Sequence, residues 1–325
     1  MTINRQKNTQ EIPMQRTLTY TLPQNTSPQT ISTFLKHHSY STTLINALKK
    51  TPTGILKNQT HACVNELLHP GDTLQITIEE TVDQESILPV ESNLSILYED
   101  EDILVINKPH NMPVHQSINN YHNTLANAVA YYFMKKGEAY VFRCINRLDR
   151  DTTGATILAK NALSAAILSE QVKNRAIHRT YMALVEGVTE EEGVVDLPIG
   201  RKEGSVIERQ VDLVNGKRAV THYRRLAVLQ YEEKEVSLLA LKLETGRTHQ
   251  IRVHMSYLGH PLLGDFLYNE GCKSMERQAL HSAMLSFSHP ITGEMMKIEA
   301  PLPEDMKRVL VAGGIEIIEE PTYCI

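Results

Sequence analysis

Residues 235–259 read EVSLLALKLETGRTHQIRVHMSYLG, and this stretch decides the interpretation of the second half of the chain. Its first part is rich in residues that favour a β-strand and ends at Gly246. A short helix is predicted directly afterwards, with Thr248 as its N-cap and Gly259 as its stop signal. A strand that passes straight into a helix, with charged residues at the junction, is a common place for a functional site.

A second charged stretch, NRLDRDTTG at residues 146–154, lies between two apolar segments. The flanking segments, YVFRCI (140–145) and ATILA (155–159), are predicted to be strands, so the charged stretch is predicted to be a loop above a sheet. Two arginines flank Asp149 in the sequence and would favour its ionised form if they lie close in space. The alternative is that the aspartates of this loop only close turns and pair with surface arginines.

The rest of the chain shows a mixed pattern of strands and helices. Strands are expected in five segments: 75–79, 103–107, 179–187, 221–230 and 235–245. Helices are expected within 27–50, starting at Ser27-Pro28, and over 123–137 and 161–175. Because the strands follow one another without regular helical crossovers, we predict an α+β fold with a mixed, mostly antiparallel sheet and flanking helices.

Charge divides the chain into parts. The 325 residues are enough for about two domains, and the formal net charge is −5. Ten acids and no base fall in residues 71–102, whereas residues 1–70 carry seven bases and two acids. We therefore predict a flexible tail (1–13), a small α+β domain (14–80), an acidic linker (81–95) and a larger domain (96–325).

Composition excludes several classes of protein. No apolar run approaches the length of a membrane span, and the first residues lack the apolar segment of a signal peptide. The four cysteines are far apart and are typical of reduced thiols, which predicts a cytoplasmic protein. The common cofactor motifs are absent, and His249 and His254 are five residues apart, which does not suit a helical metal site. We therefore expect neither cofactor nor metal.

Together the two charged stretches resemble the signature sequences of RluA-type pseudouridine synthases, in particular the RluD-like branch. Three further segments resemble the same family: LYEDEDILVINKP (97–109), HRTYMALVEG (178–187) and ALHSAMLSFSHPITGE (279–294). These motifs occur in order between about residues 96 and 305. The segment from Leu68 to Leu74 resembles the end of an S4-type RNA-binding domain, in a degenerate form.

The resemblance implies an enzyme that detaches a uracil base from its ribose within RNA, turns it and rejoins it through C5. It implies that Asp149 is the catalytic carboxylate, as nucleophile or as base, with Arg247 held against it and Tyr181 stacked on the target base. The same resemblance assigns RNA contacts to Arg147, Arg150, Lys108 and Arg252, although a structural role for Lys108 is equally open. We expect the enzyme to be a monomer whose partner is RNA. Large-subunit ribosomal RNA is the first expectation, and transfer RNA is the other possibility.

Two other functions compete with this one. A catalytically silent RNA-binding or ribosome-assembly factor on the same fold would have no need of Asp149, Tyr181 and Arg247 together. A metal-dependent hydrolase that used the histidines would bind zinc or lose activity with a chelator, and we expect neither.

Overall fold

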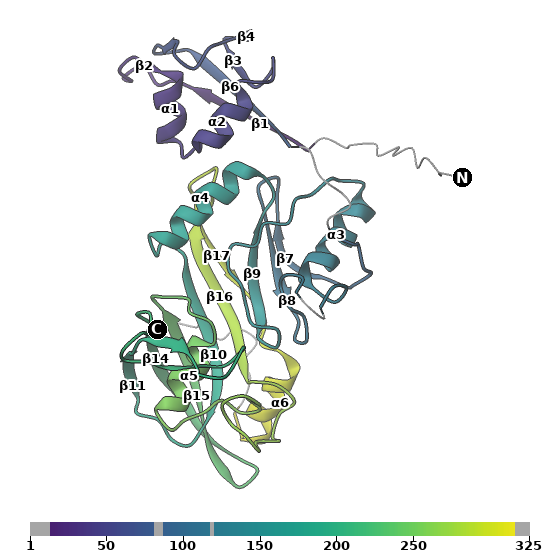
Figure 1. Ribbon diagram of the computed structural model, residues 1–325, viewed down its shortest axis with the longest axis vertical. Helices are drawn as coiled ribbons and strands as arrows, with labels where there is room; N and C mark the ends of the chain where they lie inside the picture. Colours follow the sequence, from purple (N-terminus) through teal and green to yellow (C-terminus); the bar gives the residue numbers. More distant parts are fainter. Residues whose placement is uncertain (1–13, 81–86, 118–119, 316–325) are drawn as a thin grey trace, which may run out of the picture.

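The computed structural model describes residues 14–80, 87–117 and 120–315 (Figure 1). Residues 14–80 form a small unit, the N-terminal module, in which a four-stranded antiparallel sheet of order β1-β6-β3-β4 carries two short helices. Its elements are β1 (Met14–Thr21), β2 (Gln29–Thr30), α1 (Ile31–His37), α2 (Thr42–Leu48), β3 (Ile55–Lys57), β4 (Thr60–His61), β5 (Leu67–Leu68) and β6 (Thr73–Glu80).

The remaining described residues are built on a nine-stranded sheet of order β11-β14-β15-β10-β16-β9-β8-β7, with β17 paired to β16. Its strands are β7 (Ser95–Glu99), β8 (Ile103–Lys108), β9 (Thr153–Ala159), β10 (His178–Glu186), β11 (Glu192–Asp196), β14 (Val220–Tyr231), β15 (Lys234–Leu243), β16 (Leu280–Ser288) and β17 (Met295–Glu299). The other elements are α3 (Leu125–Lys136), α4 (Ala162–Lys173), β12 (Ile199–Arg201), β13 (Arg209–Val211), α5 (Gln250–Tyr257) and α6 (Glu304–Ala312).

This sheet has one parallel contact, between β9 and β16, and its other strand pairings among the described residues are antiparallel. The parallel pair therefore joins two antiparallel halves, and the predicted mostly antiparallel α+β fold is confirmed. Gly154 lies at this seam with φ +110°, and a Cβ there would come within 2.3 Å of the Ser282 carbonyl oxygen. Only glycine tolerates that approach, which explains the last residue of the NRLDRDTTG stretch.

Strand β8 shows how the core fills both faces of the sheet. Its alternate residues Ile103 and Val105 pack in a cluster with Leu168 of α4, whereas Leu104 and Ile106 pack with residues of α3. This alternation follows the period of two in a strand. Figure 1 shows α3 and α4 on either side of these strands.

Local sequence signals account for the helices near the sheet. Helix α3 begins with a capping box at Thr124 and ends at Gly137 in the left-handed conformation, and α4 begins after Asn161, whose side chain accepts from the Ser164 N–H. The helices expected over 123–137 and 161–175 are thus confirmed.

Three local predictions are wrong. Residues 140–145 form no strand, because only Cys144 makes an isolated bridge, to Leu158. The first helix starts at Ile31, capped by Thr30 and not by Ser27. The N-cap of α5 is His249, with φ +57°, and not Thr248.

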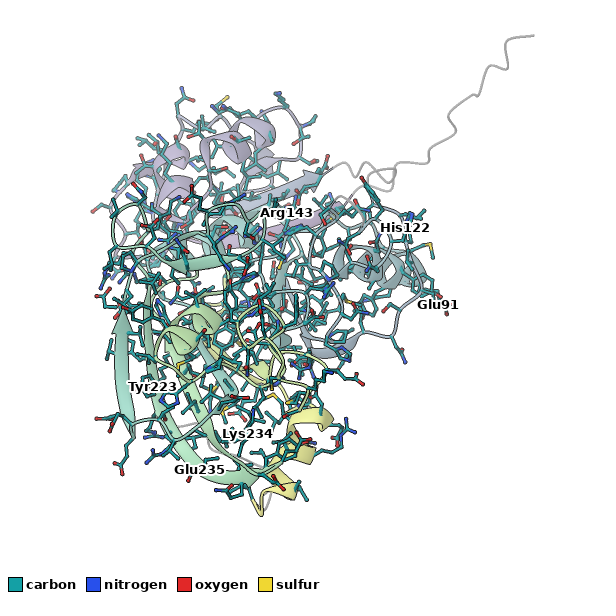
Figure 2. The ribbon with its side chains drawn as sticks, turned by 60° about the horizontal axis from the view of Figure 1, so that its bottom comes forward. Glu91, His122, Arg143, Tyr223, Lys234 and Glu235 are labelled. Carbon is teal, nitrogen blue, oxygen red and sulfur yellow. The ribbon has the colours of Figure 1, made fainter. Side chains whose placement is uncertain are left out.

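The N-terminal module is joined to the rest of the described chain by charge and by apolar packing. Arg16 of β1 donates to both carboxylate oxygens of Asp102, at 3.0 and 2.8 Å. Glu80 of β6 pairs with Arg143, which Figure 2 shows where the module meets the rest of the chain, and accepts from the Ala162 N–H at 3.0 Å. Leu163 of α4 is part of the module's own apolar cluster.

The described helices include none with the length and apolar character needed to cross a membrane. Cys63, Cys144 and Cys272 are free thiols. The predicted tail (1–13) and part of the predicted linker (81–95) lie outside the described residues.

Candidate active site

The loop that precedes β9, residues 145–152, is fastened to the sheet by Asn146. The buried Asn146 amide donates to the Ala155 carbonyl at 3.1 Å and accepts from the Ile157 N–H at 2.7 Å. A short polar side chain that bonds to the backbone on both sides fixes where the loop leaves the sheet. The loop therefore presents its next residues, Arg147 to Arg150, at a defined place above the parallel seam.

Two buried cations hold the other end of this loop. Lys108, fully buried, donates from Nζ to the carbonyls of Pro109, Met112 and Arg150 at 2.8–2.9 Å. Burial lowers the pKa of Lys108 to about 7, while the charges of nearby aspartates oppose that shift. The predicted RNA contact of Lys108 is wrong, because an ammonium that is buried and bonded to three carbonyls does not reach a ligand.

Arg277 is the second cation and was missed in the sequence. Its Nη1 donates to the Asp151 carbonyl at 3.2 Å, and its Nε and Nη2 pair with Asp305 of α6. No motif marked it, since its partners lie 126 and 28 residues away. Together Lys108 and Arg277 fix consecutive carbonyls of the loop that carries Asp149.

Asp149 lies at the edge of an open cavity and faces a guanidinium. Its side chain is 26% exposed, and its Oδ2 is 3.3 Å from Nη1 of Arg252 in the first turn of α5. The same guanidinium is bidentate to the fully buried Asp265, with both distances 2.7 Å. Burial opposes the charge on Arg252, but the bonds and charge of Asp265, with that of Asp149, raise its pKa. Arg252 therefore stays charged beside Asp149.

This geometry changes two assignments. Arg252 was expected to bind RNA, yet its side chain is 3% exposed and occupied by two aspartates, so that prediction is wrong. Arg247 was expected to lie against Asp149, but its Nε donates to the Arg218 carbonyl at 3.1 Å on the exposed side of the site. Because α5 starts only at Gln250, Arg252 is turned inward by the helix while Arg247 remains in the loop before it.

Tyr181 of β10 and the loop arginines complete the cavity. Tyr181 is buried, and burial raises the pKa of its phenol, to which the charge of Asp149 adds. Arg147 is exposed, with no ion pair to another described residue, and Arg150 pairs with Asp151 at 2.9 Å while half of its side chain is exposed. These three residues line the same cavity as Asp149.

The cavity has a volume of about 920 Å³ and is strongly basic. Its only described acids are Asp149 and Glu244, against seven Lys or Arg side chains: Arg147, Arg150, Lys173, Arg175, Arg179, Arg247 and Arg252. A basic cleft of this kind raises the local concentration of an anionic ligand. The net charge of −5 therefore does not describe the surface around Asp149.

The histidines form no metal centre at this cavity among the described residues. Both ring nitrogens of His254 are bonded, to Thr221 and to the Leu197 carbonyl, and His260 bonds to the Glu186 carbonyl. A different group, Asp100, Asp102 and His289, brings three possible ligand atoms within 4.8 Å. Its carboxylates already accept from Arg16, Asn161, Tyr98 and backbone N–H groups, so its lone pairs serve the hydrogen-bond network there.

Three comparisons with known proteins point to one family. The sequence model of a family described as RNA pseudouridylate synthase matches residues 102–257. The chain is 42% identical over 246 residues to the uncharacterized RNA pseudouridine synthase YhcT of Bacillus subtilis, which covers 75% of this chain and 80% of that protein. It is 39% identical over 266 residues to ribosomal large subunit pseudouridine synthase D of Haemophilus influenzae, covering 77% and 79%. The solved structure of human RNA pseudouridylate synthase domain containing 1 has a TM-score of 0.55 and 32% identity, over 64% of this chain and 83% of that one.

Proposed function

From the fact that this chain belongs to the RNA pseudouridylate synthase family, we propose that it converts specific uridines of large-subunit ribosomal RNA to pseudouridine, with Asp149 as its catalytic carboxylate. The observation that carries the proposal is the carboxylate of Asp149 at the rim of a basic cavity, held beside the buried cation Arg252. The relatives named ribosomal large subunit pseudouridine synthase D favour ribosomal RNA over transfer RNA.

The isomerisation breaks the bond between N1 and C1′ and forms one between C5 and C1′. The proton on C5 leaves and N1 takes up a proton, so no redox partner or imported group is required. Asp149 acts through its carboxylate, as nucleophile or as base, and Nη1 of Arg252 donates to Oδ2 of that carboxylate at 3.3 Å. Tyr181, buried beside it, offers an aromatic face to a base extruded from its stack.

The surrounding cations suit an RNA backbone. Arg147 and Arg150 flank Asp149 on the same loop and are exposed, so we assign them contacts to phosphates or to the gap that an extruded base leaves. Arg247, Lys173 and Arg175 extend this basic surface along the rim. The N-terminal module, taken as an S4-like domain, supplies a second RNA contact in this proposal.

Release of tritium from RNA that carries 5-tritiated uridine tests the function. The wild type should release tritium to water without added cofactor, whereas Asp149→Asn, which keeps the size of the side chain and removes its charge, should release none. Asp196→Asn is the matched control, because Asp196 is exposed at the end of β11 and outside the cavity. Full activity of Asp149→Asn would exclude Asp149 from the reaction, and RNA binding without release by the wild type would favour the silent binding factor.

The substrate is identified by mapping modified uridines in RNA from a strain that lacks the gene. Loss of pseudouridine in large-subunit ribosomal RNA is expected. Loss confined to transfer RNA would contradict the proposed substrate while leaving the reaction intact.

A further inference from the structure

Asp149 has a second polar neighbour besides Arg252. His249, the residue before α5, places its Nε2 3.9 Å from Oδ2 of Asp149, and its side chain is 12% exposed. The backbone of His249 has φ +57° and ψ +21°, which is uncommon for a residue other than glycine. Its side chain makes no capping bond to the helix. The His249 side chain is therefore not used to cap the helix and is directed instead toward Asp149.

The other ring nitrogen of His249 is held by Tyr268. The distance from Nδ1 of His249 to the phenol oxygen of Tyr268 is 2.9 Å, and the two rings meet edge to face. The phenol oxygen also accepts from the backbone N–H of Arg209 in β13, at 2.8 Å. Among the described residues these are its only hydrogen-bond partners, and of the two only Nδ1 of His249 can accept from the Tyr268 O–H.

This chain of bonds favours one tautomer of the imidazole. A neutral imidazole has one N–H donor and one acceptor nitrogen, and if Nδ1 accepts from Tyr268, then Nε2 carries the hydrogen. The opposite tautomer would leave the Tyr268 O–H without an acceptor among the described residues and would direct a lone pair of Nε2 at a carboxylate. Burial lowers the pKa of His249, with further lowering by Arg252 and Arg209 against the opposing charges of Asp149 and Asp265. The ring is therefore neutral near neutral pH, with Nε2–H toward Asp149.

Arg252 and His249 both face the same oxygen of Asp149. Nη1 of Arg252 is 3.3 Å from Oδ2, and Nε2 of His249 is 3.9 Å from it. Oδ1 of Asp149 accepts no hydrogen bond from another described residue, so it is free to face a ligand in the cavity. The 3.9 Å separation is longer than a hydrogen bond, as is common for catalytic groups before the substrate is bound.

We propose that His249 is a positioning residue for Asp149: with its Nε2–H directed by Tyr268, it and Arg252 hold Oδ2 and present Oδ1 to the ribose of the target uridine. This inference rests on the proposed role of Asp149 and adds the group that orients it. Tyr268 belongs to the same unit through its hydroxyl, whose bond to Nδ1 of His249 links it to the imidazole beside Asp149.

Two substitutions separate orientation from folding. His249→Asn removes Nε2 and keeps a side chain that tolerates the left-handed backbone at this position. Tyr268→Phe removes the O–H and keeps the ring, which lies 5.1 Å from the Arg252 guanidinium carbon. Tyr257→Phe is the matched control, since Tyr257 lies on α5, is 58% exposed and does not line the cavity around Asp149.

Steady-state tritium release with each variant tests the inference. We expect His249→Asn to lower kcat about tenfold to 100-fold with KM unchanged, the factor that a hydrogen bond to a charged group provides. Tyr268→Phe should lower kcat by a smaller factor. The double variant should be no slower than His249→Asn alone, because the hydroxyl that Tyr268→Phe removes acts through His249 and the ring beside Arg252 is kept. Tyr257→Phe should match the wild type.

Three outcomes would overturn the inference: an unchanged kcat in His249→Asn, a change confined to KM, or effects of the two substitutions that add in the double variant. Asp149→Asn is assayed beside them on the same RNA. If the wild type is active and Asp149→Asn is not, while His249→Asn is fully active, the positioning role fails and the proposed function stands. If the wild type itself releases no tritium, the proposed function fails first.

Discussion

The Arg252 guanidinium holds two carboxylates at once, and this double contact determines the effect of substitutions there. A lysine keeps the charge but is a point donor that cannot bind Asp265 in bidentate fashion and reach Asp149 as well. We expect Arg252→Lys to lower kcat at least about tenfold, the factor for a lost hydrogen bond to a charged group. Single-turnover tritium release measures this, and a wild-type rate in a folded Arg252→Lys protein would contradict it.

Arg247 should respond differently, because its guanidinium bonds to a backbone carbonyl at the rim and not to Asp149. We expect Arg247→Gln to raise KM for RNA with little effect on kcat. The slope of log affinity against log salt should fall by about one, as expected for one lost phosphate contact. Binding assays over a range of salt concentrations measure that slope, and a fall in kcat with unchanged KM would return the catalytic role to Arg247.

At the scale of single residues, the sequence predicted the position of the site better than the contacts within it. The resemblance to the pseudouridine synthases grouped Asp149, Tyr181 and the loop arginines in one site, and all of them line one cavity. It failed for Lys108 and Arg252, because burial of a charge depends on partners that are distant in the sequence. The Arg150 carbonyl lies 42 residues from Lys108, and Asp149 lies 103 residues from Arg252. A charged residue in a sequence motif does not reveal whether such partners will surround it in the fold.

At the scale of elements, Glu99 joins β7 to its neighbours. Its Oε1 accepts from Lys136 of α3 and from Lys160 after β9, both at 2.9 Å, and its Oε2 accepts from Tyr132. Burial opposes ionisation, but these hydrogen bonds and charges outweigh it and lower the pKa of Glu99 to about 2. The hydrogen bonds and ion pairs of Glu99 therefore contribute to the stability of the fold in a way that depends on pH.

Because the folded pKa of Glu99 is below its ordinary value of 4.5, the contribution is complete above pH 4.5 and is lost as the pH falls toward 2. We expect Glu99→Gln to lower the free energy of unfolding by about 2 kcal/mol at neutral pH. Denaturant titrations from pH 7 downward should show that difference shrinking below pH 4.5. Glu138→Gln is the control, as Glu138 pairs with the same Lys136 but is exposed. A difference that does not change with pH would contradict the assignment.

The elements themselves were largely predictable because their signals are local. Caps such as Thr124 and Asn161 and the stop at Gly137 lie within a few residues of the helices they bound. The parallel contact between β9 and β16 was not predictable, since its two strands are more than 120 residues apart. Residues 140–145 have the composition of a strand, yet they form no strand beyond the single bridge of Cys144.

At the scale of the whole molecule, the acidic block between 71 and 102 takes on a structural role. Glu80 and Asp102 in that block pair with Arg143 and Arg16 across the junction of the N-terminal module. Helix α4 connects this junction to the cavity, since its first turn contributes Leu163 to the module's core and its last turn contributes Lys173 to the cavity rim. The N-terminal module thus lies at one end of α4 and the cavity at the other. Figure 1 shows the module next to α4.

This arrangement predicts that the module and the sheet unfold together. Leu163 is 1% exposed and packs among residues of the module, so Leu163→Asp would place a charge in a shared apolar core and uncouple the two parts. We expect one calorimetric transition for the wild type and two for Leu163→Asp. Ser169→Asp is the matched control, because Ser169 is exposed on the same helix and its substitution should leave one transition.

The uncoupled variant Leu163→Asp should keep its kcat on a short RNA stem-loop, since Asp149 and its partners lie outside the junction. It should show a raised KM for long RNA that reaches the module. Two transitions in the wild type would show that the junction does not couple the parts, and an unchanged KM for long RNA would show that the module takes no part in binding.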